Sequence, residues 1–446
     1  MSAVRLIRSA IMRRMADTDL RDARRRRAER VRVREGRAHE VHYFHQPDDP
    51  YSHLAAQALR AFLTRYEVQL LSHVVAQPAP IAIHEKALWD AWARRECAAM
   101  APYYKLSYED RRCEPDPASV EMARRILLNV ESSAHFPEAS VEVGVALNND
   151  ARIELESLAT RHGSLPAPEA DLRLKQNFEL RHRLGHYLGA MFFYEGEWYW
   201  GIDRLHYLEA RLDSLGAKLR AAPSGPSASL TRRASQTIRS ERSVTLEYFP
   251  SLRSPYTHIS YDRVRDLCRR YPVELICRPV LPMMMRGVKA DRRKGAYILK
   301  DTMREAERLG VPFGNIWDPF GKPVLRAYSL FPWARDQGKG FEYLHSYSRA
   351  VWAERVDAWS ERGLQTIVER AGLSWADARR RLDNRDWEPE LEDNVNAMIA
   401  AGSWGVPTLR LPAAGSFPEF TVWGQDRLWL IEEEIARRLG VSELTR

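Results

Sequence analysis

Cysteine is scarce in this sequence. The 446 residues include only Cys97, Cys113, Cys268 and Cys277, and no two of these form a Cys-x-x-Cys pair. Their spacing fits neither a metal-ligand set nor a dense disulfide framework, so we expect no metal site. The absence of the pair excludes a dithiol oxidoreductase, and reduced thiols are typical of a cytoplasmic protein.

Long apolar segments are also missing. No run approaches the ~20 apolar residues that a membrane-spanning helix needs. Arginines interrupt the opening segment MSAVRLIRSAIMRRM too often for the apolar core of a signal peptide. We therefore expect a cytoplasmic protein with no membrane partner.

Beyond its first 38 residues the sequence has no excess of positive charge. Residues 1–38 hold thirteen Arg and five acidic residues, and the difference, 13 − 5 = +8, equals the net charge of the whole chain. Charge on every face and few apolar positions predict a polar arm. Because the arm mixes acids with arginines and has no aromatic residue for base stacking, nucleic-acid binding is the least favoured function.

The length predicts two or three domains. Residues 221–243 are rich in Ser, Ala, Pro and Arg and offer little to a core, which is typical of an interdomain linker. We therefore divide the chain into an arm (1–38), a first domain (39–220), the linker (221–243) and a second domain (244–446).

The two halves repeat each other at both ends. VHYFHQPDDPYSHL in the first half matches LEYFPSLRSPYTHI in the second, and YWGIDRLHYLEARL matches VWGQDRLWLIEEEI. We interpret the halves as diverged copies of one unit. A tandem chain of this kind is expected to form an internal pseudo-dimer.

Each half is predicted to run strand, helix, strand, long helical region, two short strands and helix. In the second half these parts are strands at Val244–Phe249, Val273–Val280, Val406–Leu411 and Phe417–Trp423, helical periodicity over Asp291–Ala401, and a helix at Asp426–Leu439. In the first half the matching parts are Val41–Phe44, Pro50–Tyr66, Val68–Val75 and Gly201–Leu215.

Three short motifs of the second half carry a family resemblance. They are Ser254-Pro255-Tyr256-Thr257, Gly405-Val406-Pro407-Thr408 and Trp423-Gly424-Gln425-Asp426-Arg427. With these motifs in this order, the second half resembles the kappa-class glutathione transferases and the bacterial 2-hydroxychromene-2-carboxylate isomerases, which have a DsbA-like fold. The resemblance implies an α/β protein of two tandem thioredoxin-like domains of the DsbA type, each with an inserted helical subdomain.

Ser254 and Thr257 stand where a dithiol oxidoreductase of this fold has its cysteines. The resemblance implies that the Ser254 hydroxyl donates a hydrogen bond to the thiolate of bound glutathione and keeps it ionised near neutral pH. Taken alone, Ser254 is better explained as an ordinary N-cap residue followed by proline at the first helical position; the two downstream motifs reverse this preference.

Val406 and Pro407 form the second part of the implied glutathione site. Thioredoxin-like proteins have a cis-proline at this place, which leaves the preceding backbone groups free to pair with a peptide-like ligand such as glutathione. The alternative is a trans-proline that starts an edge strand.

By the same resemblance, Gln425 and Asp426 hold the γ-glutamyl end of glutathione. Lys294 matches a basic residue that contacts glutathione in the kappa-class relatives, although the neighbouring Asn of that family has no counterpart here. The alternatives are that Asp426 caps the last helix and that Lys294 is an ordinary exposed side chain.

An aromatic substrate needs aromatic side chains close to the thiol. The candidates are Trp404, which directly precedes the proline motif, and Tyr256, which lies within the serine motif. His258 follows Ser254 by one helical turn, but His53 takes the same place in the first half, so a structural contact explains it better than proton transfer.

The first half has different residues at the places that correspond to the implied glutathione site. Its turn reads Asp49-Pro50-Tyr51-Ser52, and a carboxylate at the Ser254 place repels a thiolate. We place the counterpart of the proline loop at Gly185–Leu188, which has no proline. The first half is thus interpreted as a degenerate partner domain, with a different ligand as the alternative.

These observations favour a glutathione-dependent isomerase or transferase that acts on a small electrophilic, aromatic substrate. The alternatives are a non-catalytic thioredoxin-fold module that binds a protein or peptide, or a DsbA-family protein by descent that has lost dithiol activity.

Overall fold

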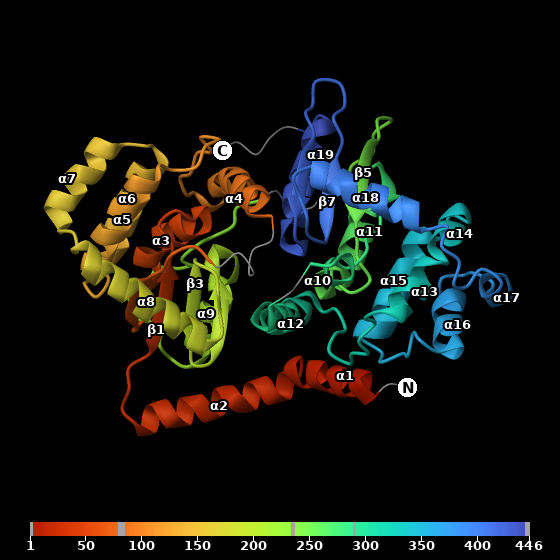
Figure 1. Ribbon diagram of the computed structural model, residues 1–446, viewed down its shortest axis with the longest axis horizontal. Coiled ribbons are helices and arrows are strands. Elements are labelled where there is room, and N and C mark those ends of the chain that lie inside the picture. Colours follow the sequence, from red (N-terminus) through yellow and green to blue (C-terminus); the bar gives the residue numbers. More distant parts are fainter. Residues whose placement is uncertain (1–2, 79–84, 233–236, 289–290, 442–446) are drawn as a thin grey trace. The chain divides into compact units, whose positions relative to one another are not determined.

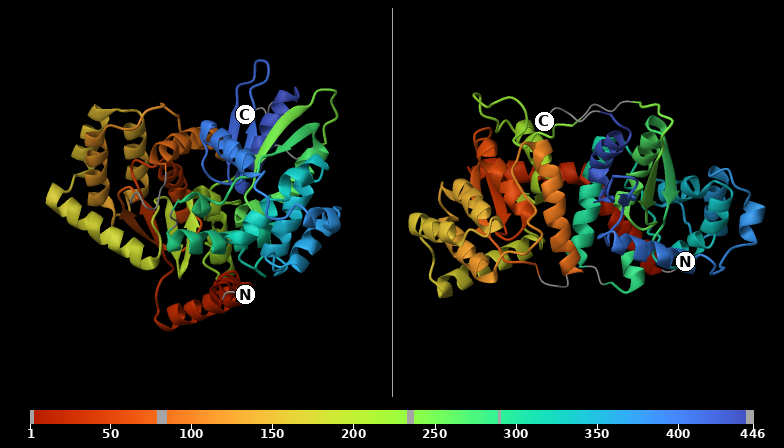
Figure 2. Two further views of the ribbon diagram at one scale, coloured as in Figure 1. Left: turned by 45° about the vertical axis from the view of Figure 1, so that its right-hand side comes forward. Right: turned by 90° about the horizontal axis from the view of Figure 1, so that it is seen from above.

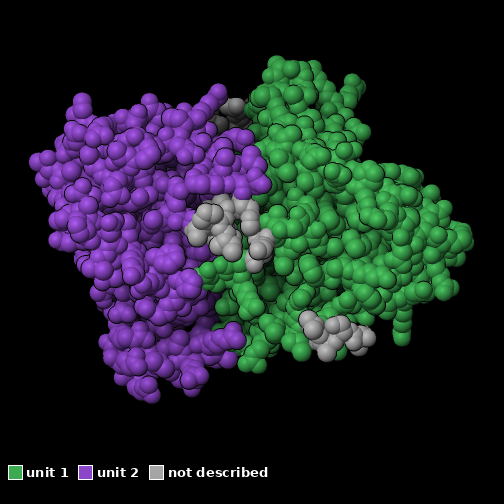
Figure 3. Space-filling model, viewed as in Figure 1, with its two compact units in different colours: residues 1–21, 233–446 green, residues 22–232 purple. Residues whose placement is uncertain are grey.

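The computed structural model describes residues 3–78, 85–232, 237–288 and 291–441 (Figure 1). Residues 1–2 of the predicted arm, 233–236 of the predicted linker and 442–446 of the predicted second domain lie outside the described residues. The chain divides into two compact units, coloured green and purple in Figure 3. Unit 1 combines Met1–Arg21 with Arg233–Arg446, and unit 2 is Asp22–Arg232.

Unit 1 is built on a four-stranded sheet in the order β6-β5-β7-β8. Its strands are β5 (Val244–Phe249), β6 (Val273–Cys277), β7 (Thr408–Leu411) and β8 (Phe420–Trp423). β6 runs parallel to the central strand β5, whereas β7 runs antiparallel to it and β8 antiparallel to β7. All four strands lie within or next to the segments that the sequence predicts.

Strand β5 is buried because both of its faces are covered. Leu246, Tyr248 and Phe249 have no exposed surface, and Phe249 packs in a core cluster with Val280 and Met398. The burial fits the position of β5 inside the sheet, between β6 and β7. The chain leaves this strand and enters the turn that contains Ser254.

The helices of unit 1 follow the predicted helical region closely. The helices in the part of unit 1 that follows the linker are α10 (Pro255–His258), α11 (Tyr261–Arg270), η2 (Met283–Arg286), α12 (Arg292–Leu309), α13 (Lys322–Tyr328), α14 (Phe331–Asp336), α15 (Gly340–Trp352), α16 (Glu361–Arg370), α17 (Trp375–Arg379), α18 (Glu388–Ala400), η3 (Gln425–Arg427) and α19 (Leu428–Arg438). Figures 1 and 2 show α13 to α17, in cyan and blue, as one helical group beside the sheet. Its centre is aromatic, with Trp352, Tyr343 and Tyr347 almost fully buried.

The predicted polar arm is helical, and its first part belongs to unit 1. Helix α1 (Ala3–Met15) packs with Ser9 and Met12 buried. Asp318 N–H donates to Ser9 Oγ over 3.0 Å, and Arg8 forms an ion pair with the same aspartate at 3.1 Å. Segment 1–21 is therefore a docked element of unit 1.

Unit 2 contains a second sheet, in the order β2-β1-β3-β4. Its strands are β1 (Glu40–His45), β2 (Gln69–Val74), β3 (Met191–Tyr194) and β4 (Glu197–Trp200). β1 pairs in parallel with β2 and antiparallel with β3, and β4 completes the sheet antiparallel to β3. The strand order and directions thus correspond, strand for strand, to those of unit 1.

The helices around this second sheet are α2 (Thr18–Arg34), α3 (Pro50–Leu63), α4 (Lys86–Met100), η1 (Ala101–Tyr104), α5 (Pro117–Val130), α6 (Phe136–Asn148), α7 (Arg152–His162), α8 (Ala167–Leu184) and α9 (Gly201–Ser214). Helix α2 has no buried residue, and Arg25 ties it to the sheet of unit 2 through a 2.6 Å ion pair with Glu197. In the described part of the chain, no helix is long and apolar enough to cross a membrane.

Candidate functional site

Ser254 is the N-cap residue of α10, just after β5 ends. Its Oγ accepts a hydrogen bond from the Thr257 N–H at 3.1 Å and donates to the Val406 carbonyl at 3.4 Å. The second distance is beyond the usual 2.5–3.0 Å range for a hydroxyl donor. The hydroxyl proton is therefore only weakly engaged.

A buried carboxylate fixes the turn that presents Ser254. Arg253 Nε donates to Asp318 Oδ1 at 3.1 Å, and the Asp318 side chain is only 1% exposed. This is the aspartate that also receives Arg8 of helix α1. No local pattern predicts this contact, because nothing near Asp318 in the sequence marks it as a partner of either arginine.

The three motifs meet in space. The Val406–Pro407 peptide bond is cis, as the resemblance implies, and the Pro407 carbonyl accepts a hydrogen bond from the Gly424 N–H at 2.9 Å. Ser254 touches this loop through Val406. Hydrogen bonds therefore connect the serine turn, the proline loop and the start of the last helical segment.

Trp404 is buried and packs against Trp423, with ring centroids 4.7 Å apart. Gly405 lies so close to the Trp423 indole that an added Cβ would overlap the ring. Trp404 directly precedes the proline loop, and its ring is part of the packing that supports the loop.

Gln425 is buried, and both ends of its side chain are engaged. Its Oε1 accepts a hydrogen bond from Arg263 at 2.6 Å, and its Nε2 donates to Glu305 at 2.7 Å. The side chain therefore holds η3 against α11 and α12. Neither Arg263 nor Glu305 is near Gln425 in sequence, so no local pattern predicts this network.

Asp426 lies at the surface of the same turn, with its side chain 20% exposed and 3.7 Å from Arg427. The preceding Gly424 has a φ of +102°, and an added Cβ there would crowd the Asp426 carboxylate. Glycine is therefore needed at 424 for the turn to form.

Lys294 stands in the first turn of α12, where burial lowers the pKa of its amine. In the described part of the chain, no acidic side chain pairs with it. Helix α12 meets α10 through the Tyr256 hydroxyl, which donates to Asp301 at 2.8 Å. Asp301 is two helical turns beyond Lys294, so this contact joins α10 to α12 about 10 Å further along the helix than Lys294.

His258 is buried, and both of its ring nitrogens have partners. Nε2 lies 2.9 Å from the Pro312 carbonyl and Nδ1 lies 3.2 Å from Ser348 Oγ. Because a carbonyl can only accept, Nε2 carries the proton and Nδ1 accepts from the serine. Burial lowers the pKa of His258 to about 4, and both hydrogen bonds make the ring part of the packing around α10.

All four cysteines are free thiols. Burial raises the pKa of Cys268 to about 11, and burial also raises the pKa of Cys277. Neither is activated as a nucleophile, and Cys97 is buried.

In unit 2, Asp49 caps α3 as Ser254 caps α10. Its Oδ2 accepts hydrogen bonds from the Ser52 N–H at 3.0 Å and the Ser52 hydroxyl at 2.7 Å. Burial nevertheless raises the pKa of Asp49 to about 7.

The predicted counterpart of the proline loop in unit 2 is wrong. Gly185 is the left-handed C-cap of α8, so Gly185–Leu188 begins as a helix end. The strand registers pair Phe249 with Thr408 and Phe44 with Met191. Counting back from these strand residues, Ala190 takes the place of Pro407 and Gly189 that of Val406.

This geometry defines a mixed α/β protein with a thioredoxin-type sheet, turn and cis-proline loop in its C-terminal half. Residues 245–436 match the DSBA-like thioredoxin domain family. This part of the chain is therefore a DsbA-like thioredoxin domain. No curated protein matches the chain.

Solved structures similar to this chain include a 2-hydroxychromene-2-carboxylate isomerase, which is 19% identical over 45% of this chain and 100% of its own, with a TM-score of 0.37. A probable DsbA oxidoreductase from Streptomyces coelicolor is 16% identical over 46% of this chain and 93% of its own, with a TM-score of 0.35. The cytosolic disulfide reductase DsbM from Pseudomonas aeruginosa, with GSH, is 18% identical over 44% of this chain and 100% of its own, with a TM-score of 0.34.

Proposed function

We propose that unit 1 binds glutathione and activates its thiol for an isomerase or transferase reaction on a small electrophilic, aromatic substrate. One observation carries this proposal: a hydroxyl, that of Ser254, takes the cysteine place of a DsbA-like domain and lies against the cis-proline loop. A chain without a thiol at this place needs the sulfur of a cosubstrate.

The hydrogen bonds of Ser254 suit a thiolate. Because Oγ already accepts the Thr257 N–H, its own proton points elsewhere, toward the Val406 carbonyl at 3.4 Å. A thiolate is a charged and therefore stronger acceptor than a carbonyl at that distance. The hydroxyl can turn to it with little loss, and its hydrogen bond to the ionised form lowers the pKa of the bound thiol.

The proline loop suits a peptide-like ligand. In the part of the chain that the structure describes, the Val406 N–H has no hydrogen-bond acceptor. An extended cosubstrate that pairs with this N–H would place its thiol beside Ser254. We propose that Asp426 receives the amino group of glutathione and Lys294 one of its carboxylates. Gln425, whose side chain is fully engaged, would act as a positioning residue.

The two reactions share their first step. The thiolate adds to an electrophilic carbon of a conjugated substrate and forms a carbon–sulfur bond, and the electron pair moves into the conjugated system. In the isomerase, a bond of the adduct rotates, the carbon–sulfur bond breaks, and the thiolate leaves with its electron pair. In the transferase, the adduct takes up a proton and is released. Trp404 and Tyr256 are the aromatic side chains proposed to lie nearest the substrate.

We also propose that unit 2 is a second, diverged copy of the same domain. Its strand order matches that of unit 1, and Trp200 pairs with Met191 as Trp423 pairs with Thr408. The Trp-Gly-x-Asp-Arg motif therefore has the same sheet register in both units. We keep the predicted pseudo-dimer and cytoplasmic location as parts of this proposal.

Calorimetric titration of reduced glutathione tests the thiol-activating role. The variants are Ser254→Ala and, as a matched control, Ser374→Ala, which removes the exposed N-cap hydroxyl of α17. We expect micromolar to low-millimolar binding and a thiolate absorbance band at neutral pH that fades in Ser254→Ala only. S-methylglutathione, which has no thiol proton, should bind both variants alike. Absence of glutathione binding in all three proteins would overturn the proposal.

A non-catalytic binding module is the second candidate. It is favoured by the engagement of Ser254, Gln425 and His258 in intramolecular hydrogen bonds. The unpaired Val406 N–H would then receive an extended segment of a partner protein. Failure of the glutathione titration, with binding of unstructured peptides that Val406→Pro abolishes, would support this candidate.

A further inference from the structure

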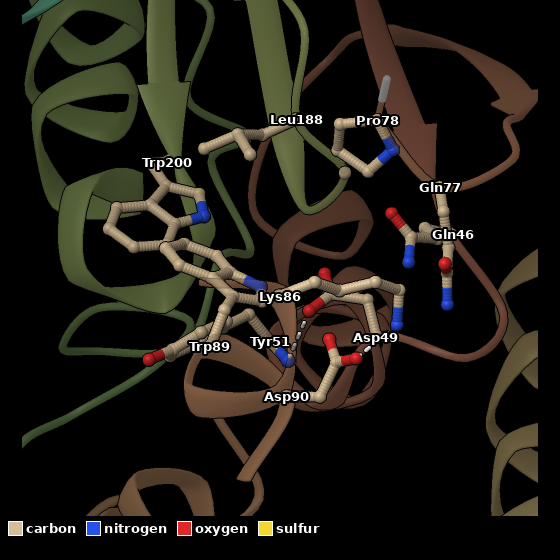
Figure 4. A pocket seen from close by; sticks show the side chains of 11 residues that line it. Gln46, Asp49, Tyr51, Gln77, Pro78, Lys86, Trp89, Asp90, Leu188 and Trp200 are labelled. Atoms are coloured by element: carbon tan, nitrogen blue, oxygen red, sulfur yellow. Dashed lines mark hydrogen bonds and ion pairs between the residues drawn. The ribbon is translucent and has the colours of Figure 1, made fainter. Parts of the chain in front are cut away.

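Unit 2 contains a cavity of about 220 Å³ at the start of α3 (Figure 4). Clefts for drug-sized ligands usually measure ~300–1,000 Å³, so this one suits a small molecule. Its walls come from the end of β1, the segment after β2, the first turns of α3 and α4, the loop before β3, and the end of β4. All the residues that line it belong to unit 2.

The cavity lies at the unit 2 counterpart of the Ser254 turn. Asp49 stands in the place of Ser254, Gly189 in that of Val406, and Trp200 in that of Trp423, and all three line it. An added Cβ at Gly189 would overlap Gln46 and crowd Ser52. The close approach of this loop to the Asp49 turn therefore requires a glycine at position 189. The proline that unit 1 has at the next position is absent here.

One wall is aromatic. The rings of Trp89 and Trp200 are nearly parallel, at 21° and 6.4 Å between centroids, and Tyr51 lies 5.1 Å from Trp200. The Tyr51 hydroxyl is held by Glu96 at 2.6 Å, so its ring is fixed. Figure 4 shows both indoles on one side of the cavity and Asp49 and Asp90 beside them. Aromatic faces attract cations as well as apolar groups.

The charges of the cavity leave one carboxyl uncompensated. Lys86 forms an ion pair with Asp90. Asp49 accepts hydrogen bonds only from Tyr51 and Ser52 and has no cationic partner in the described part of the chain. Burying a carboxylate without a cation is costly. The cost is visible in Asp49, because burial raises its pKa to about 7 despite the Ser52 hydrogen bonds.

We propose that this cavity binds a small organic ammonium ion, with the charged head against Asp49 and the apolar part against Trp200 and Trp89. The ligand supplies the cation that Asp49 lacks, and the indole faces accept both its charge and its carbon skeleton. A thiolate is disfavoured because it would face a second negative charge at Asp49. The proposal is independent of the glutathione site, which lies in unit 1.

Binding of the cation is coupled to loss of the Asp49 proton. An opposite charge within ~4–6 Å lowers a carboxyl pKa by about 1–3 units, so the bound form is ionised at neutral pH. The titratable or charged groups that face Asp49 are Asp48, Tyr43, Tyr108, Lys86 and Asp90. The tyrosines stay neutral, since burial raises their pKa values. Asp49 is therefore the group that changes charge near pH 7.

The test is calorimetric titration of the full chain with benzylamine, which stays protonated between pH 6 and 8, and with the uncharged benzyl alcohol. The ionised fraction of a carboxyl with a pKa of about 7 rises from ~0.1 to ~0.9 over this range. We expect the benzylamine affinity to rise about tenfold while the benzyl alcohol affinity stays flat. Reduced glutathione serves as the thiol probe for the same cavity.

Asp49→Asn keeps the N-cap acceptor and removes the charge. We expect it to weaken benzylamine binding about tenfold at pH 8 and to abolish the pH dependence. Glu156→Gln, an equal charge change at an exposed position of helix α7, is the control and should leave binding unchanged. If Asp49→Asn fails to fold, titration of the wild type in buffers of different ionisation enthalpy should show release of about half a proton per benzylamine at pH 7.

Three results would overturn the proposal. The first is equal affinity for benzylamine and benzyl alcohol, which would make the cavity an apolar site. The second is benzylamine binding that neither depends on pH nor releases a proton. The third is binding of glutathione, with no benzylamine binding, in Ser254→Ala protein, which would make unit 2 a thiol site.

Discussion

Ser9 Oγ accepts a hydrogen bond from the Asp318 N–H at 3.0 Å, across 309 positions of the chain. The Asp318 carboxylate also binds Arg8 of α1 and Arg253 beside the Ser254 turn. One buried acid thus joins the beginning of the chain to the candidate glutathione site.

Asp318→Asn should therefore destabilise unit 1 by about 1–3 kcal/mol, because two guanidinium groups lose a nearly buried carboxylate. Urea unfolding measures the loss, and faster amide exchange in residues 5–16 would show that α1 is released. Asp336→Asn, whose side chain is 63% exposed in a surface ion pair, should change the stability by less than ~0.5 kcal/mol. Unchanged exchange in α1 would contradict the role given to Asp318.

Asp49 makes the stability of unit 2 depend on pH. Its pKa of about 7 in the folded chain is above the ~3.9 of an unfolded aspartate. The stability that comes from the neutral acid is therefore fully present below pH ~4 and is lost as the pH rises through 7. Asp49→Asn should stabilise unit 2 by roughly 1–3 kcal/mol at pH 8 and by much less at pH 5. The range allows for the screening of the Asp49 charge by solvent in the cavity. Urea midpoints at both pH values measure this, and an equal effect at both would refute it.

A redox-active pair of cysteines should be possible in the Ser254 turn. In the double variant Ser254→Cys, Thr257→Cys, the backbone N–H that now donates to Ser254 Oγ would stabilise a thiolate. We expect the variant to form a reversible disulfide and to catalyse insulin reduction, while Ser254→Cys alone does not. The exposed native Cys113 serves as the reference thiol in alkylation rates. Two inert thiols at 254 and 257 would show that the turn is not of the redox type.

Gly405 and Gly295 offer a matched pair for the packing of the proline loop. An added methyl at Gly405 meets the Trp423 indole, whereas Gly295, in helix α12, has open space around it. We expect Gly405→Ala to destabilise unit 1 by about 1–3 kcal/mol and Gly295→Ala to stabilise it by up to about 1 kcal/mol. Thermal unfolding compares the two, and Trp fluorescence should change only in Gly405→Ala. Equal effects of the two substitutions would show that the loop is not packed against Trp423.

The sequence predicts the frame of each unit well because the informative signals are local. Alternating apolar residues mark β5, and the repeated Trp-Gly-x-Asp-Arg motif has the same register in both sheets, as Trp200 and Trp423 show. Ser254 and Pro407 are found through the short motifs that carry the family resemblance, and each motif is a local stretch of sequence.

The remaining features depend on contacts between distant residues. The burial of Gln425 follows from Arg263, 162 positions away, and Glu305, 120 positions away. Helix α1 gives no clear amphipathic signal, since Ile7 and Ile11 are more than half exposed while Ser9 is buried. The Gly185 assignment failed because a glycine that ends a helix looks, in sequence, like a glycine that opens a loop.

The docking of α1 also has a consequence for synthesis. Met12 and Ser9 leave the ribosome long before Asp318, which lies 309 positions after Ser9. At ~5–20 residues per second, the helix spends roughly 15–60 s without the surface that buries it. Unit 2 can fold in that interval, whereas the DsbA-like domain recruits a segment that was translated 309 positions before Asp318. Any chaperone that binds exposed helices during translation would find α1 available for that period.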